Sequence, residues 1–377
     1  MSTYFAALSD ALKAAGIFQP CLLLDLDMLD HNIALVRERL APGLALRLVD
    51  KSLACLPLLS YIGKALRTNR FMTFHPPVTE AVLKAFPDAD MLFGKPMPVG
   101  AARAVLANGA TDWSRVCWLI DTEERLAEYG ALASELDIEL RIAFEIDVGL
   151  HRGGFTGPQA LKALPTHERL RSEGIMAYEA HAPHIPGLFG GPAKALEQAS
   201  VSAVAFAACL SADQRRILNI GGSKTALLHR GGVANEVSIG SAFMLPSDFD
   251  TPGLDGFQPA AFIATPILKV VEPMLPGPAA VSRALQTIGL FPRKGCYLYG
   301  GKWMAEPEFP VGMKPNRLLG LSSNQQFMGL PSDASVKPGD YAFLRPTQSE
   351  AVLQHFGSMT VLSGGSIVDR WPALPMA

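Results

Sequence analysis

Short apolar runs alternate with amphipathic stretches through the first two thirds of the chain. The runs occupy residues 44–49, 71–74, 91–93, 116–120, 140–146, 175–180, 217–220 and 236–243. They are apolar almost throughout, as strands are when a parallel sheet is covered on both faces. The pattern therefore predicts eight buried strands.

The stretches between these runs predict helices. Apolar positions recur at helical spacing over residues 78–86, 99–108, 122–136 and 192–210. Thr122 is placed to cap the third of these helices, and Asn108-Gly109 to end the second. Eight strands alternating with helices predict an α/β protein with a closed parallel (β/α)8 TIM barrel. A doubly wound open sheet is the alternative, which is less favoured because no G-x-G-x-x-G follows the first strand.

The two ends of the chain follow other patterns. Residues 1–19 have apolar positions at helical spacing with charges among them, so they predict a helix and not a signal peptide. Residues 21–27 predict a strand and 28–40 a helix. Beyond Met244, Pro, Gly and Asp become frequent and helical periodicity fades, which predicts an all-β domain over 257–377. Its strands are expected at 261–271, 282–290, 296–299, 318–321, 341–344 and 351–362.

Composition and charge narrow the class of protein. The 377 residues are 49% hydrophobic and 18% charged, with a mean hydropathy of +0.20, which predicts globular folding without disorder. A net charge of −2 excludes a strong basic field for nucleic acid or a membrane surface. The five cysteines form no C-x-x-C pair, which argues against disulfides and a zinc site. We therefore expect a cytoplasmic protein with a small-molecule ligand.

Two strand ends carry candidate chemistry. Gly221-Gly222-Ser223 follows the seventh predicted strand and offers backbone amides and a hydroxyl to a phosphate; a plain tight turn is the alternative. Lys51 ends the first strand, where an ammonium is costly unless its pKa falls or it is covalently modified. The alternative is a lysine that extends to the rim and pairs with Asp50. A phosphate site facing such a lysine favours pyridoxal 5'-phosphate as the cofactor.

These segments resemble those of fold-type III pyridoxal-phosphate enzymes of the D-threonine aldolase and D-serine dehydratase group, distant relatives of alanine racemase. Arg47-Leu-Val-Asp-Lys51 is similar to the family's R-x-H-x-K, so the resemblance implies that Lys51 is the Schiff-base lysine. The segment from Leu22 to Ile33 resembles the family's opening strand and helix. The resemblance thus implies that residues 1–40 pack with the β domain of 257–377, around a cofactor-binding barrel of 41–250.

Further matches imply the cofactor site. Glu145-Ile-Asp147-Val-Gly149-Leu-His-Arg152-Gly-Gly and Gly174-Ile-Met-Ala-Tyr178 resemble segments that carry a cofactor-facing arginine and tyrosine. The implied cofactor-binding residues are Lys51, Arg152, Tyr178, Gly221, Gly222, Ser223, Gly240 and Ser241. His181 is a candidate acid or base, as is His184, and for both the alternative is a rim histidine with satisfied hydrogen bonds.

The chain departs from the family where the family binds a divalent metal. Its P-x-H-x-C or P-x-H-x-D segment reads Pro346-Thr-Gln348-Ser-Glu350 here, and a second histidine is replaced near Gln326. A neutral amide is a poor ligand for zinc or manganese, so we expect no metal site of the usual kind. Glu350 is instead a candidate general base; as the alternative, Gln348 and Glu350 are surface strand residues. Val49 also replaces the histidine that precedes the lysine by two positions.

The resemblance implies a lyase, aldolase or dehydratase in type, that acts at Cα and Cβ of a D-configured β-hydroxy amino acid. Three alternatives stay open: an amino-acid racemase or epimerase on the same scaffold, a catalytically silent pyridoxal-phosphate carrier, and a sugar-phosphate enzyme that does not need Lys51. The resemblance also implies a homodimer, in which the second domain of one chain closes the site of the other.

Overall fold

The eight predicted strands close into a parallel barrel. The computed structural model describes residues 2–376, which divide into two units. The barrel unit contains Asn32–Phe243, Phe249–Phe257 and the residues from Leu374 onward. The sheet unit contains the chain up to His31, Met244–Asp248 and Gln258–Ala373.

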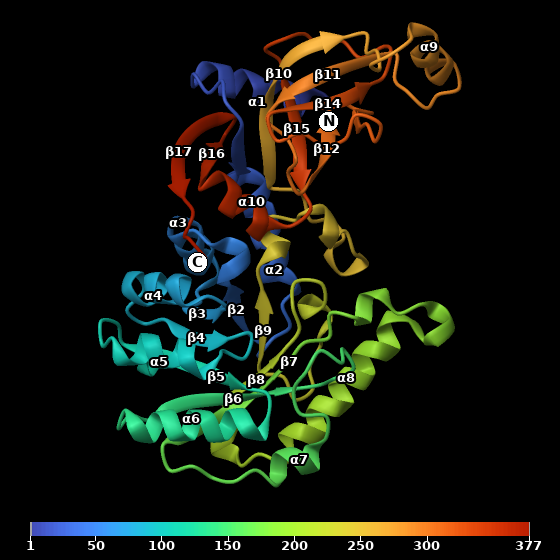
Figure 1. Ribbon diagram of the computed structural model, residues 1–377. Helices are drawn as coiled ribbons and strands as arrows, with labels where there is room; N and C mark the ends of the chain where they lie inside the picture. The colour runs from blue at the N-terminus through green and yellow to red at the C-terminus, as the bar shows by residue number, and fades with distance from the viewer. Residues whose placement is uncertain (1, 377) are drawn as a thin grey trace. The chain divides into compact units, whose positions relative to one another are not determined.

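The barrel runs in sequence order from β2 to β9, and β9 pairs in parallel with β2 to close it (Figure 1). Its strands are β2 (Ala45–Val49), β3 (Arg70–Thr73), β4 (Asp90–Phe93), β5 (Val116–Ile120), β6 (Leu140–Ile146), β7 (Leu170–Ala177), β8 (Ile217–Ile220) and β9 (Glu236–Ile239). Closure confirms the predicted barrel and rules out the open doubly wound sheet.

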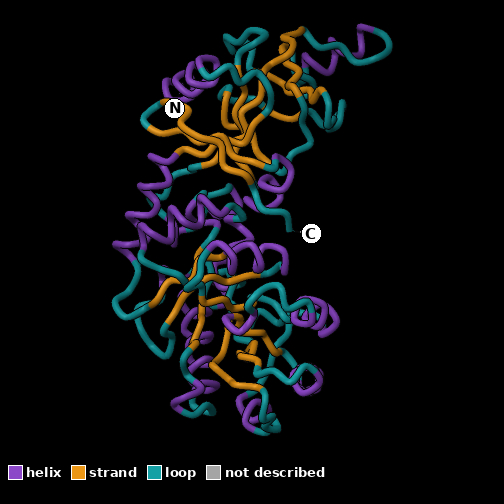
Figure 2. The backbone as a smooth tube through the Cα atoms, turned by 90° about the vertical axis from the view of Figure 1, so that its left-hand side faces the viewer, coloured by secondary structure: helices purple, strands orange, loops and turns teal. Residues whose placement is uncertain are grey.

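Helices cover the outside of these strands, as Figure 2 shows. They are α2 (Leu26–Arg39), α3 (Leu56–Leu66), α4 (Pro76–Ala85), α5 (Val99–Ala107), α6 (Glu123–Glu135), α7 (Pro158–Lys162) and α8 (Gly191–Ala207). The predicted cap of α6 is present, because the backbone N–H of Arg125 donates to Thr122 Oγ1 at 3.1 Å. No helix among residues 2–376 has the length and apolar content needed to cross a bilayer.

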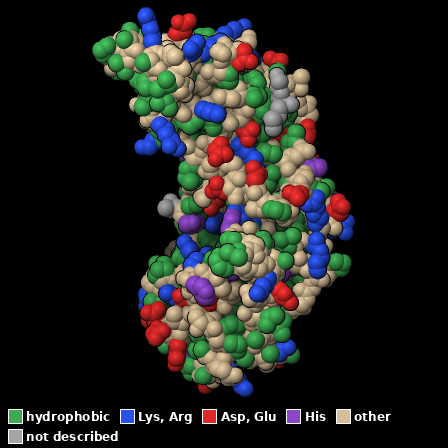
Figure 3. Space-filling model, turned by 90° about the vertical axis from the view of Figure 1, so that its right-hand side faces the viewer, with side chains coloured by type: hydrophobic (Ala, Val, Ile, Leu, Met, Phe, Trp, Pro, Cys, Tyr) green, Lys and Arg blue, Asp and Glu red, His purple; other side chains and the backbone are tan. Residues whose placement is uncertain are grey.

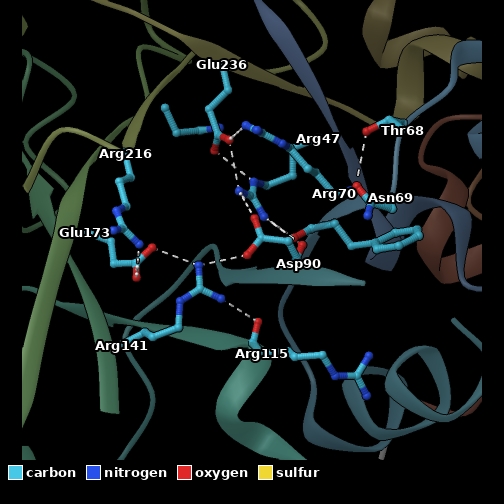
Figure 4. Close-up of polar contacts among 12 residues, drawn as sticks. Arg47, Thr68, Asn69, Arg70, Asp90, Arg115, Arg141, Glu173, Arg216 and Glu236 are labelled. Atoms are coloured by element: carbon cyan, nitrogen blue, oxygen red, sulfur yellow. Dashed lines mark hydrogen bonds and ion pairs between the residues drawn. The ribbon is translucent and has the colours of Figure 1, made fainter. Parts of the chain in front are cut away.

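A network of ion pairs fills the barrel at the amino-terminal ends of its strands (Figure 4). Arg47 is fully buried and contacts Glu236 through Nε at 2.8 Å and Asp90 through Nη2 at 2.8 Å. Arg141 joins Asp90 to Glu173. Burial opposes the ionisation of Asp90, but the two guanidinium groups lower the pKa of its carboxyl below the ordinary value. This end of the barrel is thus closed by paired charges, opposite the end where catalytic residues lie in this architecture.

The sheet unit is built around one mixed sheet of nine strands. These are β1 (Cys21–Asp25), β10 (Ala261–Val271), β11 (Lys294–Tyr299), β12 (Ala305–Phe309), β13 (Lys314–Pro315), β14 (Gln325–Leu330), β15 (Tyr341–Pro346), β16 (Ser358–Ser363) and β17 (Ser366–Pro372). β1 lies between β10, to which it is antiparallel, and β16, to which it is parallel. The amino-terminal strand therefore belongs to this sheet, as the resemblance implied.

The amino-terminal helix α1 (Ser2–Ala14) provides one side of the core of this unit. Phe5, Leu8 and Leu12 are buried on one face of the helix, at the spacing seen in the sequence. The Phe5 ring lies 5.4 Å from that of Phe262 and 4.9 Å from that of Phe343, measured between centroids. The helix is thus fixed to the sheet by aromatic packing.

Three sequence predictions in this unit are wrong. Residues 282–290 were expected as a strand, but helix α9 (Ala279–Thr287) occupies most of them. Residues 351–362 divide into helix α10 (Ser349–Phe356) and strand β16, and residues 318–321 lie in a turn. Short apolar stretches fit both helical and extended periods, and alanines favour the helix in α9.

Candidate active site

Lys51 lies at the carboxyl-terminal end of β2, in the 3-10 turn Asp50–Leu53 that follows the strand. Its side chain is half-buried, and Nζ lies 4.8 Å from the centre of the Phe74 ring, just beyond the end of β3. An aromatic face stabilises an ammonium group at this distance. The lysine is therefore held at the end of the barrel where this architecture places its chemistry.

Asp50, which precedes this lysine, is fully buried. Burial raises the pKa of its carboxyl from 3.8 to about 8, while the Thr73 hydroxyl, the backbone N–H of Lys51 and the Lys51 charge lower it in part. Within the described part of the chain, neither carboxylate oxygen has a hydrogen-bond partner of normal geometry. This burial could not be predicted from the sequence, because Asp50 stands between an apolar strand and a lysine.

The glycine loop (221–229) follows β8 and is tied to the segment after β9. Ser223 Oγ accepts hydrogen bonds from the backbone N–H groups of Gly240 at 3.0 Å and Ala242 at 3.3 Å. Inside the loop, the N–H of Gly222 donates to Thr225 Oγ1 at 3.2 Å. The two segments predicted to hold a phosphate thus lie side by side, as strands seven and eight of a barrel require.

The same segments contact the strand that leads to Lys51. A Cβ atom built on Gly240 would lie 2.8 Å from Cβ of Val49 and 3.1 Å from Cβ of Ser52, so only glycine fits there. Ser241 Oγ donates to Ser52 Oγ at 3.1 Å. These contacts join the residues on both sides of Lys51 to the predicted phosphate site.

Tyr178 and Arg152 extend this cluster. A Cβ atom on Gly222 would lie 2.6 Å from Cε2 of Tyr178, which shows how closely the tyrosine ring covers the glycine loop. The Arg152 guanidinium lies 5.3 Å from the centre of that ring and donates to Glu145 at 3.2 Å. Burial raises the pKa of Glu145, and the arginine opposes the shift. All the predicted cofactor residues are thus brought together at one end of the barrel.

His181 lies on a neighbouring cleft. With Asp147 and His151 it lines a space of about 500 Å³, and its Nε2 is close to Gly149, 3.1 Å from where a Cβ would lie. His184 is exposed and contacts Lys224 Nζ at 3.4 Å. Figure 3 shows histidine side chains reaching the surface on the face that carries α8. The contacts of His181 are thus with the loop after β6, and its catalytic role stays a prediction.

The residues at the expected metal positions belong to the sheet unit and have other partners. Gln326 is buried, its Oε1 accepts the N–H of Lys302 at 2.6 Å, and its Nε2 contacts Met328 Sδ at 3.3 Å. Gln348 Nε2 lies 3.4 Å from Asp248 Oδ2, and Glu350 is in the first turn of α10. Gln348 and Glu350 therefore flank a helix start and not a strand. In residues 2–376, no group of three or more His, Cys, Asp and Glu side chains is arranged to hold a metal ion.

Sequence reasoning missed the buried pair of Glu179 and His229. Glu179 Oε1 lies 2.9 Å from His229 Nε2, and Glu179 Oε2 accepts the N–H of Gly221 at 3.2 Å. Glu179 directly follows Tyr178, in a segment that was singled out for its tyrosine and histidine. A charged residue so close to the end of an apolar strand was the available signal.

Comparison with known proteins identifies the family of the chain. Residues 24–247 match the family model described as the alanine racemase N-terminal domain. The chain belongs to this family. The match covers the barrel strands from β2 to β9 and the last two residues of β1. A comparison with curated proteins gives no significant match.

Solved structures resemble this alanine racemase-family chain along almost its whole length. D-threonine aldolase from Filomicrobium marinum has 17% sequence identity and a TM-score of 0.73, with 94% of this chain and 96% of that chain covered. D-threo-3-hydroxyaspartate dehydratase from Delftia sp. HT23 has 16% identity and a TM-score of 0.68, covering 94% and 97%. Alanine racemase from Bacillus anthracis has 14% identity and a TM-score of 0.69, covering 94% and 98%. The family match confirms the predicted relationship to alanine racemase, and these structures share the fold of the chain.

Proposed function

We propose that this protein is a pyridoxal-phosphate-dependent lyase that acts at Cα and Cβ of a D-configured β-hydroxy amino acid. The observation that carries the proposal is the close contact of Gly240 with Val49 and Ser52, because it joins the residues around Lys51 to the segment after β9. That segment is in turn hydrogen-bonded to Ser223 of the glycine loop. The names of two similar structures, an aldolase and a dehydratase, support this reaction class.

The residues present fit the cofactor. Lys51 Nζ would hold its aldehyde carbon, and Ser223 with Gly240 and Ser241 would hold its phosphate. In the described chain the backbone N–H groups of Ser223 and Ser241 have no acceptor, whereas those of Gly221 and Gly222 are used within the protein. When bound, the cofactor supplies an electron sink for breaking a bond at Cα. Tyr178 would limit the space beside the glycine loop, and Lys51 Nζ would carry a proton to or from Cα of the substrate.

We propose further that the reaction proceeds without the divalent metal of the family's usual site. The amides of Gln326 and Gln348 are weak ligands, and both already have protein partners. The residues therefore do not fit a zinc or manganese ion. Glu350 is proposed as the general base for the substrate hydroxyl, because it is a carboxylate at the position of a family metal ligand. Glu350→Gln should then lower kcat with little change in KM for the substrate.

The first test is the covalent trapping of the cofactor. After incubation with pyridoxal phosphate and reduction with borohydride, peptide mass spectrometry should find a pyridoxyl group on Lys51. Lys64, an exposed lysine on α3, is the internal control and should stay unmodified at stoichiometric cofactor. An adduct spread over surface lysines, or none, would contradict the proposal. Activity on D-configured β-hydroxy amino acids that is unchanged by EDTA, with metal content checked by mass spectrometry, would support the metal-free reaction.

A racemase is the second candidate. It is favoured by the alanine racemase among the similar structures and by the loss of metal ligands. A racemase needs an acid or base on each face of the substrate. Lys51 is proposed as one of them and Tyr178 as the other, with His181 as the alternative to Tyr178. Exchange of the Cα hydrogen for deuterium without release of aldehyde or keto acid would favour this candidate. In either case a homodimer is expected, and light scattering tests it.

A further inference from the structure

A buried acid and base lie directly behind the glycine loop. The Glu179 side chain is completely buried and that of His229 is 5% exposed, and their Oε1 and Nε2 atoms are 2.9 Å apart. A buried carboxylate is costly without a hydrogen-bonding partner, so each residue depends on the other. Neither residue is among those predicted to touch the cofactor.

The carboxylate also fixes the loop at its beginning. Its second oxygen, Oε2, accepts the N–H of Gly221 at 3.2 Å. Gly221 has a φ of +89° and is packed against His229 and Glu179, so the turn at the end of β8 needs glycine. One side chain, Glu179, thus joins the first residue of the glycine loop to the last, His229.

The loop between these two residues is held in a single geometry. Thr225 and Ala226 both donate their N–H groups to the carbonyl of Gly222, and Tyr178 packs on the other side of that glycine. Ser223 is consequently fixed with its hydroxyl oxygen beneath the N–H groups of Gly240 and Ala242. A site whose donors are fixed before binding loses less entropy when a phosphate arrives.

We propose that Glu179 and His229 are positioning residues that fix the glycine loop for the phosphate group of the cofactor. The inference rests on the proposed function, because it assumes that this loop receives the phosphate of pyridoxal phosphate. The pair acts through Gly221 and the loop, and it touches neither the aldehyde carbon nor Lys51. Its loss should therefore weaken binding of the phosphate and leave binding of the ring unchanged.

The experiment compares pyridoxal phosphate with pyridoxal, which lacks the phosphate. Kd is measured for both by absorbance titration of the full-length apoprotein. His229→Leu should raise Kd for pyridoxal phosphate about ten- to a hundredfold, the effect of leaving a buried polar group without its hydrogen-bond partner, and leave Kd for pyridoxal unchanged. His229→Gln keeps an N–H that can reach Glu179 and should restore most of the affinity.

A matched control is available in β7, the strand that precedes Glu179. Like Glu179, Glu173 of β7 is a buried acidic residue, but its partner is Arg141 at 2.9 Å, in the ion-pair network at the opposite end of the barrel. Glu173→Gln should leave the ratio of the two Kd values at its wild-type value. Glu179→Gln is a second variant of nearly unchanged shape, for use if His229→Leu fails to fold. It should raise Kd for pyridoxal phosphate and leave Kd for pyridoxal unchanged.

One result would overturn the positioning role alone, and a different result would overturn the proposed function. Equal weakening of both ligands, or no weakening of either, in a folded His229→Leu or Glu179→Gln variant would overturn the positioning role. Failure of the wild-type protein to form an adduct at Lys51 would instead overturn the proposed function, and the inference with it. Melting temperatures of the apoproteins establish which variants are folded.

Discussion

Arg47 and Glu236 are both completely buried, and Nε of the arginine donates to Oε1 of the glutamate at 2.8 Å across the seam where β2 meets β9. Glu236 also accepts hydrogen bonds from Arg70 and from Asn219. The strand that leads to Lys51 is thus anchored below its carboxyl-terminal end by a fully buried ion pair. Removing Glu236 would leave the fully buried guanidinium of Arg47 with the half-buried Asp90 as its carboxylate partner, so its charge would be compensated less well.

Glu236→Gln is therefore expected to lower the free energy of unfolding by about 3–5 kcal/mol. Glu80→Gln is the control, because Glu80 pairs with Lys84 on an exposed helix face and should cost less than about 1 kcal/mol. Urea denaturation monitored by tryptophan fluorescence measures both. Equal effects of the two substitutions would show that the buried pair contributes no more than a surface one.

Asp50 should make stability depend on pH. Its pKa is about 8 in the folded protein, against about 3.9 in the unfolded chain, so the folded state binds the proton more tightly. This contribution is complete below about pH 4 and is lost as the pH rises through 8, at up to about 1.4 kcal/mol per pH unit. Asp50→Asn should remove this pH dependence. The free energy of unfolding of the variant should therefore decrease less than that of the wild type between pH 4 and neutral pH.

Denaturation midpoints between about pH 4 and 8 test this prediction. Glu128→Gln, which removes an exposed carboxylate from α6, should keep the wild-type pH dependence. An Asp50→Asn profile parallel to that of the wild type would mean that Asp50 is ionised in the folded protein throughout this range.

Gly240→Ala should damage the site by overpacking it. The added methyl group would lie 2.8 Å from Cβ of Val49 and 3.0 Å from its carbonyl oxygen, and such strain costs about 1–3 kcal/mol. Shifting residue 240 would also disturb the N–H that donates to Ser223, so pyridoxal phosphate should bind more weakly. Gly100→Ala, at an open position in α5, should instead stabilise the protein by about 0.5–1 kcal/mol. A Gly240→Ala protein with wild-type melting temperature and affinity would refute the close contact.

Tyr178→Phe distinguishes the two candidate reactions. The ring would still cover Gly222 and face Arg152, while the hydroxyl that a racemase needs as an acid or base would be gone. A lyase should therefore keep most of its kcat, whereas a racemase should lose about a hundredfold or more. The rate of aldehyde or ammonia release measures the lyase activity, and the rate of change of optical rotation measures the racemase activity. Tyr178→Ala should impair both, because the packing against the loop is lost.

The barrel could be predicted from the sequence because its strands are buried on both faces. Such strands are apolar at nearly every position. The eight runs from 44–49 to 236–243 could therefore be recognised as strands without knowledge of tertiary contacts. Helices α9 and α10 could not be recognised in the same way. They are short and half-exposed, and segments such as 282–290 fit both a helix and a strand until their neighbours are known.

The candidate site was only partly accessible to sequence reasoning. Lys51 and the glycine loop were found because they follow predicted strands at the reactive end of a barrel. The Glu179–His229 pair and the Arg47–Glu236 pair join residues far apart in the chain, and single carboxylates and histidines have no distinctive spacing. Their partners become visible only when closure of the barrel brings the strands together.

The position of β1 has a consequence for synthesis on the ribosome. Leu22 and Leu24 pair with Met359 and Val361 of β16, so the first strand of the protein lies beside one of the last. Every barrel strand is translated between them, and β1 must wait with an open edge until β16 emerges. Exposed edges invite pairing with other chains. Nascent chains stalled before residue 358 should therefore aggregate through β1 even when their barrel is complete. A chaperone that covers this strand should reduce the aggregation.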